Sequence, residues 1–165
     1  MLEIWLDVEN ISEEDEELKS FDKLICKKGI EDKFSNFELV VTDGQSIFNN
    51  SGGKIGACIH IADENDQLNA KSLVGSVEWI LITADDWKMI PLENLIAAAQ
   101  NTPTKIATKM DSIDQMTGAA YALGTGVDAL IVSDLRESGD IAKSIAIKKR
   151  NTDEVINIDL YDYLL

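Results

Sequence analysis

Short apolar runs separated by segments of helical spacing restrict the fold of this chain more than any other feature. The runs have the length of buried strands, and most are bounded by glycine, asparagine or charged residues. They cover residues 3–8, 37–41, 55–61, 79–82, 105–108 and 127–133. Strands that alternate with helices need crossover connections, so the sequence predicts a mainly parallel sheet covered by helices.

Between these runs, apolar residues recur every three or four positions, as they do on one face of a helix. In the first such segment, Ser12 is a candidate N-cap and is followed at this spacing by Leu18, Phe21, Leu24 and Ile25. Further helices are predicted over residues 68–74, from Pro91 onward, over residues 112–123 and through residues 141–147.

The resulting fold class is α/β, with about six βα units arranged as an incomplete TIM-like barrel. Because a closed TIM barrel requires eight units, an open doubly wound sheet is the alternative. Residues 1–150 are expected to form this α/β domain. Residues 155–160 alternate apolar and polar side chains as an edge strand does, so residues 151–165 are expected to begin a following β segment or a tail.

Composition excludes some classes of partner. The net charge is -15 over 165 residues, and this sign repels nucleic acid and anionic membranes, so neither is an expected partner. Cys26 and Cys58 lack the spacing of a zinc or redox motif and are expected to be buried thiols. No signal peptide or membrane-spanning stretch is visible, so we expect a cytoplasmic protein.

The polar stretch DDWKMIPLEN, residues 85–94, follows a predicted buried strand. Open α/β sheets bind ligands at the carboxyl ends of their strands, so we expect the functional site here. Lys88, beside Trp87, is a candidate nucleophile toward a carbonyl group, and the alternative is a surface lysine paired with a nearby acid. Asp85 and Asp86 are candidates to bind a cation or to act as acid and base, and the alternative is that the pair caps a loop or a helix.

Other candidates flank this stretch. Glu93 and Asn94 fall in the first turn of the next helix, where they either help to dock a substrate carboxylate or cap the helix. Lys105 and Lys109 bracket the following strand; Lys109, at its carboxyl end, is the better candidate, whereas Lys105 is expected at the opposite rim or in solvent. His60 is the single histidine, and a lone histidine more often has a structural role.

Phosphate-binding motifs are missing from the sequence. No G-x-G-x-x-G follows the first strand, and no P-loop lysine motif occurs. Gly124-Thr125-Gly126 follows a helix and precedes a strand, the wrong order for holding phosphate at a helix start. We interpret it as the end of a helix.

The segments DDWKMIPLENLIAAAQ and TKIATKMDSIDQMTGAAYALGTGVDALIVS resemble the amino-terminal region of the archaeal-type 3-dehydroquinate synthases, or dehydroquinate synthase II. That family includes the bacterial 3-amino-4-hydroxybenzoate synthases. The resemblance is strongest over residues 79–133 and looser before residue 75. The residues that match the family motif and its next strand are Trp87, Lys88, Glu93, Asn94, Lys105 and Lys109. Thr108 departs from the family pattern, which often has an acid there.

The resemblance implies an enzyme of aromatic amino acid biosynthesis, in the shikimate pathway, with oxidoreductase and lyase chemistry. Such an enzyme deaminates an amino dideoxy heptulosonate oxidatively with NAD and cyclises the diketo product to 3-dehydroquinate. The hydroxybenzoate branch instead implies ring formation without net hydride transfer and with a divalent metal. A non-catalytic binding or assembly module on the same scaffold is the remaining alternative.

The matching residues receive roles through the same resemblance. The implied catalytic residues are Lys88, Lys109 and Asp86, and the implied substrate-binding residues are Trp87, Glu93, Asn94 and Lys105. The implied substrate is a small keto acid, and a homo-oligomer is compatible with the family. Family members are longer and add a β-rich carboxy-terminal region. The chain is therefore expected to be a fragment, a partner of a separate β-rich subunit, or a relative that has lost the complete reaction.

Overall fold

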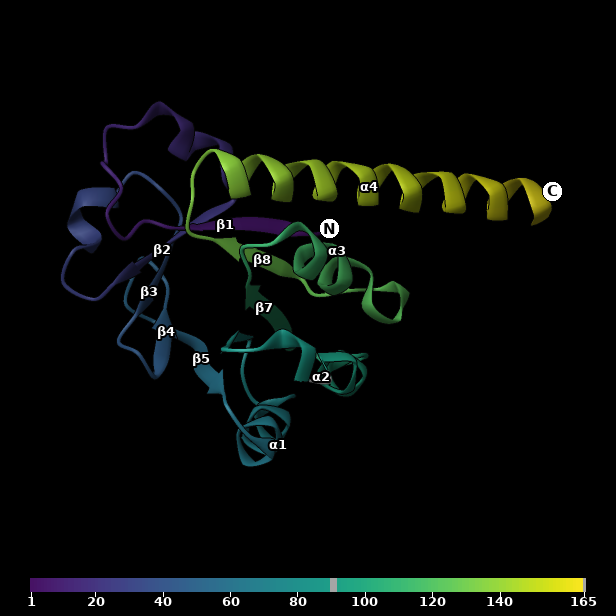
Figure 1. The fold of residues 1–165 in the computed structure, drawn as a ribbon, viewed down its shortest axis with the longest axis horizontal. Helices are drawn as coiled ribbons and strands as arrows, with labels where there is room; N and C mark the ends of the chain where they lie inside the picture. The colour runs from purple at the N-terminus through teal and green to yellow at the C-terminus, as the bar shows by residue number, and fades with distance from the viewer. Residues whose placement is uncertain (90–91, 165) are drawn as a thin grey trace.

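The computed structural model describes residues 1–89 and 92–164, with the side chains of residues 1–88 and 92–153. Its centre is a closed barrel in which the strands are hydrogen-bonded in chain order (Figure 1). The strands are β1 (Glu3–Asp7), β2 (Lys23–Lys27), β3 (Leu39–Thr42), β4 (Ser46–Phe48), β5 (Lys54–Ile61), β6 (Trp79–Ala84), β7 (Lys105–Lys109) and β8 (Ala129–Val132). Parallel pairing of β1 with β8, with Trp5 opposite Ile131, closes the sheet.

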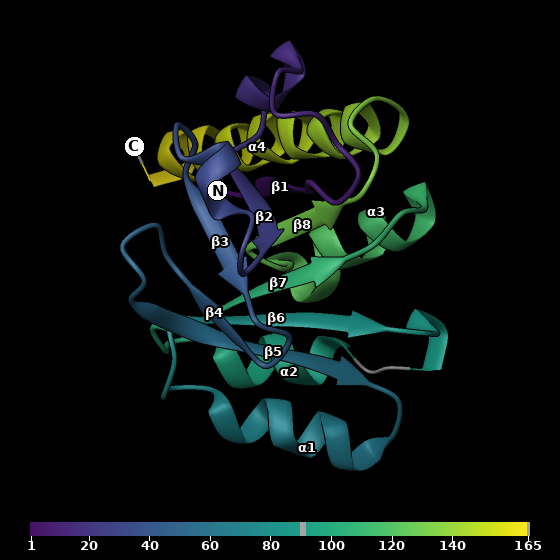
Figure 2. The ribbon, with the colours of Figure 1, turned by 90° about the vertical axis from the view of Figure 1, so that its left-hand side faces the viewer.

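Four α-helices follow the last four strands in turn. They are α1 (Glu64–Leu73), α2 (Leu92–Ala99), α3 (Ile113–Tyr121) and α4 (Glu137–Leu164), and the shorter 3-10 helices are η1 (Glu16–Ser20), η2 (Glu31–Phe34), η3 (Trp87–Met89) and η4 (Ala122–Gly124). Helix α4 lies along β1 and extends past the barrel, whereas α1 packs beside β5 (Figures 1 and 2). Among the described helices, none combines the length and the apolar character needed to span a membrane.

The predicted incomplete TIM-like barrel and its alternative, an open doubly wound sheet, are both wrong. The barrel is closed, and its sheet is mixed because β4 pairs antiparallel with both β3 and β5. The Asp43 carboxylate accepts the backbone N–H groups of Gln45 and Ser46 at 3.0 and 2.7 Å, which forms a tight turn between β3 and β4. So short a connection can join only antiparallel strands.

Strands β2 and β4 are the strands that the sequence did not predict. Strand β2 lies in a segment that was expected to be helical. Its residues Leu24, Ile25 and Cys26 are all buried. A strand buried on both faces gives a continuous apolar run, and this run happened to continue a helical spacing. Strand β4 covers only Ser46–Phe48, too short for an alternating pattern to be recognised.

The remaining elements confirm their predicted type, with shifted ends, except near the carboxyl terminus. Residues 155–160 were expected to form an edge strand, but they lie within α4. Each residue added to an established helix gains a backbone hydrogen bond. This gain favours continuing the helix over starting a strand from six residues that alternate between apolar and polar side chains. The division at residue 150 into a domain and a following segment remains a prediction. Pro91, expected at the first helical position, lies outside the described residues.

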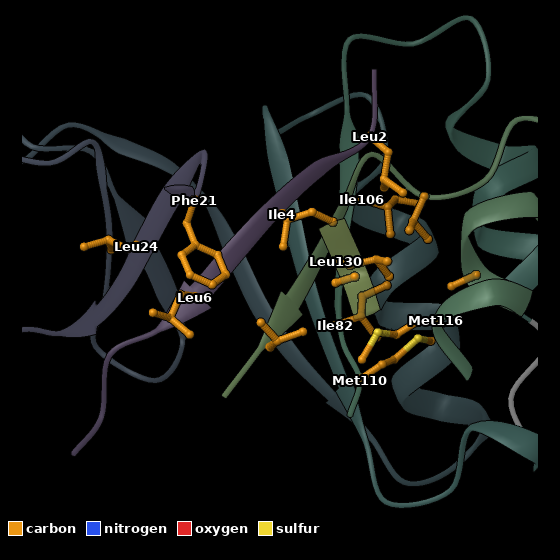
Figure 3. Packing of buried hydrophobic residues seen from close by; sticks show 14 of the residues in the cluster. Leu2, Ile4, Leu6, Phe21, Leu24, Ile82, Ile106, Met110, Met116 and Leu130 are labelled. Atoms are coloured by element: carbon orange, nitrogen blue, oxygen red, sulfur yellow. The ribbon is translucent and has the colours of Figure 1, made fainter. Parts of the chain in front are cut away.

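Two apolar layers stabilise the barrel. Figure 3 shows the outer layer, in which Met116 of α3 packs against Ile82, Met110 and Leu130 between the strands and the helices. The inner layer fills the barrel with the other face of the same strands. It contains Trp5, Ile25, Val40, Ile47, Trp79, Leu81, Ala107, Ala129 and Ile131. An eight-stranded barrel is narrow enough for side chains to fill its interior.

Two tryptophans close the amino-terminal end of the barrel. The rings of Trp5 and Trp79 are 4.6 Å apart and tilted by 59°. The Lys23 ammonium lies 5.0 and 4.8 Å from these ring centroids, and Lys105 lies 5.4 Å from the centroid of Trp79. The aromatic rings fill this end of the barrel. The polar side chains of the interior lie at the other end, at the carboxyl ends of the parallel strands.

Candidate active site

The polar residues inside the barrel gather at the carboxyl ends of its strands. There they line a hollow of about 210 Å³, which we call the barrel mouth. Its polar side chains are Asp7, Thr42, Cys58, His60, Thr83 and Lys109. They lie together because residues two positions apart on a strand face the same side, so each continues the inner row of its own strand. Lys109, for example, follows the buried Ala107 of the inner layer.

Lys109 and Asp7 form the central contact of the barrel mouth. The Lys109 Nζ atom lies 3.0 Å from Asp7 Oδ2, and the two side chains are 33% and 21% exposed. Both residues are the last of their strands, β7 and β1, which flank β8. The pair therefore places an amine beside a carboxylate that can exchange a proton with it, in a partly enclosed hollow.

The same ion pair borders a second hollow of about 310 Å³. This space is lined by Asp7 and Lys109 together with Glu9, Asn10 and Ser133 from the ends of β1 and β8. The amine is thus accessible from two sides.

His60 lies on the rim of the barrel mouth, and sequence reasoning did not place it among the site residues. Its Nδ1 atom is 2.8 Å from Thr83 Oγ1, and its Nε2 atom is 3.3 Å from Asp85 Oδ1. The register of β5 and β6, which pairs His60 with Thr83, would have pointed to it. Strands that are predicted one at a time do not reveal their register.

The tryptophan of the DDWK motif connects to the barrel mouth through the backbone. Trp87 Nε1 donates a hydrogen bond of 3.1 Å to the carbonyl oxygen of Lys109. Trp87 also packs against the outer apolar layer. It is therefore placed to hold the end of β7, and with it the start of the Lys109 side chain.

Asp86 and Lys88 do not enter the barrel mouth. Asp86 Oδ1 accepts the backbone N–H of Lys88 at 2.9 Å, which caps the turn into η3. The exposed Lys88 side chain lines a separate hollow of about 420 Å³, together with Glu93, Asn94 and Met110. This hollow lies between α2 and α3 and does not contain Lys109. The structure thus separates two candidate lysines that the sequence had grouped together.

Lys105 lies at the other end of the barrel, over Trp79. It starts β7, and Lys109 ends the strand. This placement agrees with the expectation that Lys105 faces the opposite rim. Thr108, where the family often has an acid, is fully buried and contacts Met110 Sδ at 3.8 Å on the outer side of the strand. The residue at this position therefore does not face the barrel mouth.

The two thiols are unsuited to nucleophilic work at neutral pH. Burial raises the pKa of the Cys58 thiol, against a smaller opposing effect of its hydrogen bond with Thr42. Burial also raises the pKa of Cys26, to about 11, with smaller contributions from the charges of Glu31 and Asp7. A thiol attacks carbonyl groups as its thiolate, so neither cysteine is favoured as a nucleophile here.

Comparisons with known proteins agree on one family. A family model described as the 3-dehydroquinate synthase II N-terminal domain matches residues 1–147. A 3-dehydroquinate synthase of Methanothrix thermoacetophila is 34% identical over 99 residues, which cover 60% of this chain and 27% of that protein. Another, of Methanococcus maripaludis, is 27% identical over 161 residues, 92% of this chain and 44% of that protein. The chain therefore spans less than half the length of these relatives. No solved structure matches it significantly.

Proposed function

The chain belongs to the family of the 3-dehydroquinate synthase II N-terminal domain, and from this membership we propose that its barrel mouth supplies the carbonyl chemistry of such an enzyme. The substrate is an open-chain keto acid of aromatic amino acid biosynthesis, derived from an amino dideoxy heptulosonate. Lys109 bonds to a ketone of this substrate. The resulting adduct prepares the neighbouring carbon for ring closure to 3-dehydroquinate.

The observation that carries this proposal is the position of Lys109. Of the three candidate lysines, Lys109 is the one whose ammonium lies in the barrel mouth, 3.0 Å from a carboxylate. Lys88 lines another hollow, and Lys105 lies over Trp79 at the far end of the barrel. A lysine that forms an imine needs an adjacent group to exchange protons, and Asp7 supplies one.

The proposed step begins with transfer of the ammonium proton from Lys109 to Asp7. The free amine then attacks the ketone carbon, so the C–N bond forms and the C=O π electrons move to oxygen. Loss of that oxygen as water, with protons returned by Asp7, leaves an iminium ion. The Asp7 carboxylate, deprotonated again, then takes a proton from the adjacent carbon, and the C–H electrons convert the iminium to an enamine, a carbon nucleophile for cyclisation.

The described residues do not fit NAD. A pyrophosphate is bound where free backbone N–H groups and the dipole at a helix start meet a glycine-rich turn. All four described α-helices instead carry acids in their first turns, which repel phosphate. These acids are Glu64 and Asp66 in α1, Glu93 in α2, Asp114 in α3, and Glu137 and Asp140 in α4.

The proposal assigns hydride transfer to another part of the enzyme, in line with the greater length of the relatives. A divalent metal has no obvious site either, since the described residues contain no group of three or more histidine, cysteine, aspartate or glutamate side chains suited to one.

The proposal is tested by trapping the imine. The purified chain is incubated with 3-dehydroquinate, whose ketone should react, and reduced with borohydride; modified peptides are then identified by mass spectrometry. We expect the adduct on Lys109 and none in Lys109→Met. Lys105→Met, four positions earlier on the same strand, is the matched control and should retain the adduct. No adduct on Lys109, or an adduct on Lys88 instead, would overturn the proposal.

A second measurement addresses turnover. The chain is assayed with the amino heptulosonate and NAD, alone and mixed with the remaining region of a longer relative. We expect NADH and ring product only in the mixture, and loss of both with Lys109→Met. Full turnover by the Lys109→Met mixture would instead favour a non-catalytic role for the chain.

A further inference from the structure

We propose that Asp85, His60 and Thr83 form a proton relay that serves a substrate oxygen in the barrel mouth. The inference rests on the proposed function, because it assumes that Lys109 holds the same substrate. None of these three residues is among those that match the family motif. Thr83 is the group that contacts substrate, whereas His60 and Asp85 act through it.

Two contacts in series define the relay. Asp85 Oδ1 lies 3.3 Å from His60 Nε2, and His60 Nδ1 lies 2.8 Å from Thr83 Oγ1. Thr83 in turn lines the barrel mouth. A carboxylate, an imidazole and a hydroxyl in this order form the arrangement by which enzymes move a proton to or from a hydroxyl group.

The strands fix this geometry. His60 and Thr83 are register partners on the parallel strands β5 and β6, so their side chains leave the same face of the sheet. Asp85 follows directly after the end of β6 at Ala84. Its carboxylate reaches the imidazole from the solvent side, where Asp85 is 84% exposed and His60 is 51% exposed. The relay thus runs from solvent to the hollow.

The other polar groups of the barrel mouth already have partners of their own, so we assign protonation of the substrate oxygen to the relay. Across the hollow, Asp7 is already paired with Lys109. The Cys58 thiol, on the same strand as His60, contacts Thr42, and burial raises its pKa. Ring closure of a diketo acid needs one group to activate the first ketone and another to protonate the second. Lys109 suits the first task and the relay suits the second.

The proposed step balances as follows. The enamine carbon held by Lys109 attacks the second carbonyl carbon, so a C–C bond forms and the C=O π electrons move to oxygen. The Thr83 hydroxyl gives its proton to that oxygen and takes a proton from His60 Nδ1, while His60 Nε2 gains one from the solvent side through Asp85. The ring is left neutral, with its Nε2–H directed at Asp85, and the nitrogen on Lys109 becomes an iminium that water hydrolyses.

The test uses the single histidine of the chain, since its imidazole gives one unambiguous set of ¹⁵N signals. We expect Thr83→Val and Asp85→Asn to shift these signals and Thr83→Ser to leave them close to wild type. Asp86→Asn is the matched control, because Asp86 contacts the Lys88 backbone rather than His60. Thermal melts verify that each variant is folded.

Adding 3-dehydroquinate decides whether the relay faces the ligand. We expect the ligand to shift the His60 signals in the wild type, and to shift them much less in Thr83→Val, although Lys109 is still trapped by borohydride in that variant. If Lys109 is trapped while the His60 signals never move, the relay is refuted and the proposed function stands. If nothing is trapped on Lys109, the proposed function itself fails, and the relay fails with it.

Discussion

Lys109 Nζ lies 3.0 Å from Asp7 Oδ2, although the two residues are 102 positions apart in the chain. The contact exists because closure of the barrel brings the ends of β1 and β7 to either side of β8. It joins the opening strand to the strand after the DDWK motif. The pairing makes Lys109 the centre of the proposed site and gives it a proton acceptor.

Asp7→Asn should slow formation of the borohydride-trapped Lys109 adduct by about 10²-fold, because an amide cannot accept the ammonium proton. The rate is measured by mass spectrometry over a time course with 3-dehydroquinate. Glu9→Gln is the control, since Glu9 pairs with Lys27 at 3.3 Å and not with Lys109. Equal rates for Asp7→Asn and the wild type would remove Asp7 from the mechanism.

Trp87→Phe should lower the free energy of unfolding by about 1 kcal/mol, because it removes the hydrogen bond to the Lys109 carbonyl and keeps most of the packing. It should also slow trapping on Lys109, since the end of β7 is no longer held. Urea denaturation and the trapping time course measure the two effects. A stability loss with unchanged trapping would mean that Trp87 serves the fold alone.

Gly56→Ala should destabilise the barrel by about 1–3 kcal/mol, because the added methyl group would overlap the Trp79 carbonyl oxygen on the neighbouring strand. Gly118→Ala in α3 is the matched control. Its methyl group meets nothing within 4 Å, so it should stabilise the helix by about 0.5–1 kcal/mol. Urea denaturation of both variants tests this, and equal effects would contradict the strand contact.

Alkaline pH should destabilise the protein through Cys26. Its pKa is raised from 9.0 to about 11 by burial, so between these values the unfolded chain loses the thiol proton while the folded chain keeps it. Stability is therefore full below pH 9 and falls as the pH rises toward 11. Between pH 8 and pH 10 this contribution of Cys26 falls by about 1.3 kcal/mol.

Cys26→Ala isolates this contribution. Urea denaturation at pH 8 and pH 10 should show a smaller pH-dependent loss for the variant than for the wild type, whatever its stability at pH 8. Other groups that titrate in this range affect both proteins alike and cancel in the comparison. Identical losses would show that Cys26 does not titrate in this way.

The sequence placed a site at the carboxyl ends of the strands, in residues 85–94, and preferred Lys109 over Lys105 because of its position on the strand. The polar residues of the barrel interior gather at that end of the strands, and their role as a site remains a proposal. The closed, mixed barrel was not predicted, because β2 resembled a helical segment and β4 is only three residues long. Lys88 and Asp86 were grouped with Lys109 as the catalytic residues that the family resemblance implies. In space, Asp86 caps a turn and Lys88 lines another hollow.

The sequence alone determined what depends on local pattern: most of the strands and helices, the DDWK motif and the family resemblance that the comparisons confirm. Only the tertiary structure decided which side chains meet. The closing pair of β1 and β8 brings Asp7 to Lys109, and the register of β5 and β6 brings His60 to Thr83. Local spacing reports which residues are buried. It does not encode how distant strands align, because that alignment is set by packing around the whole barrel.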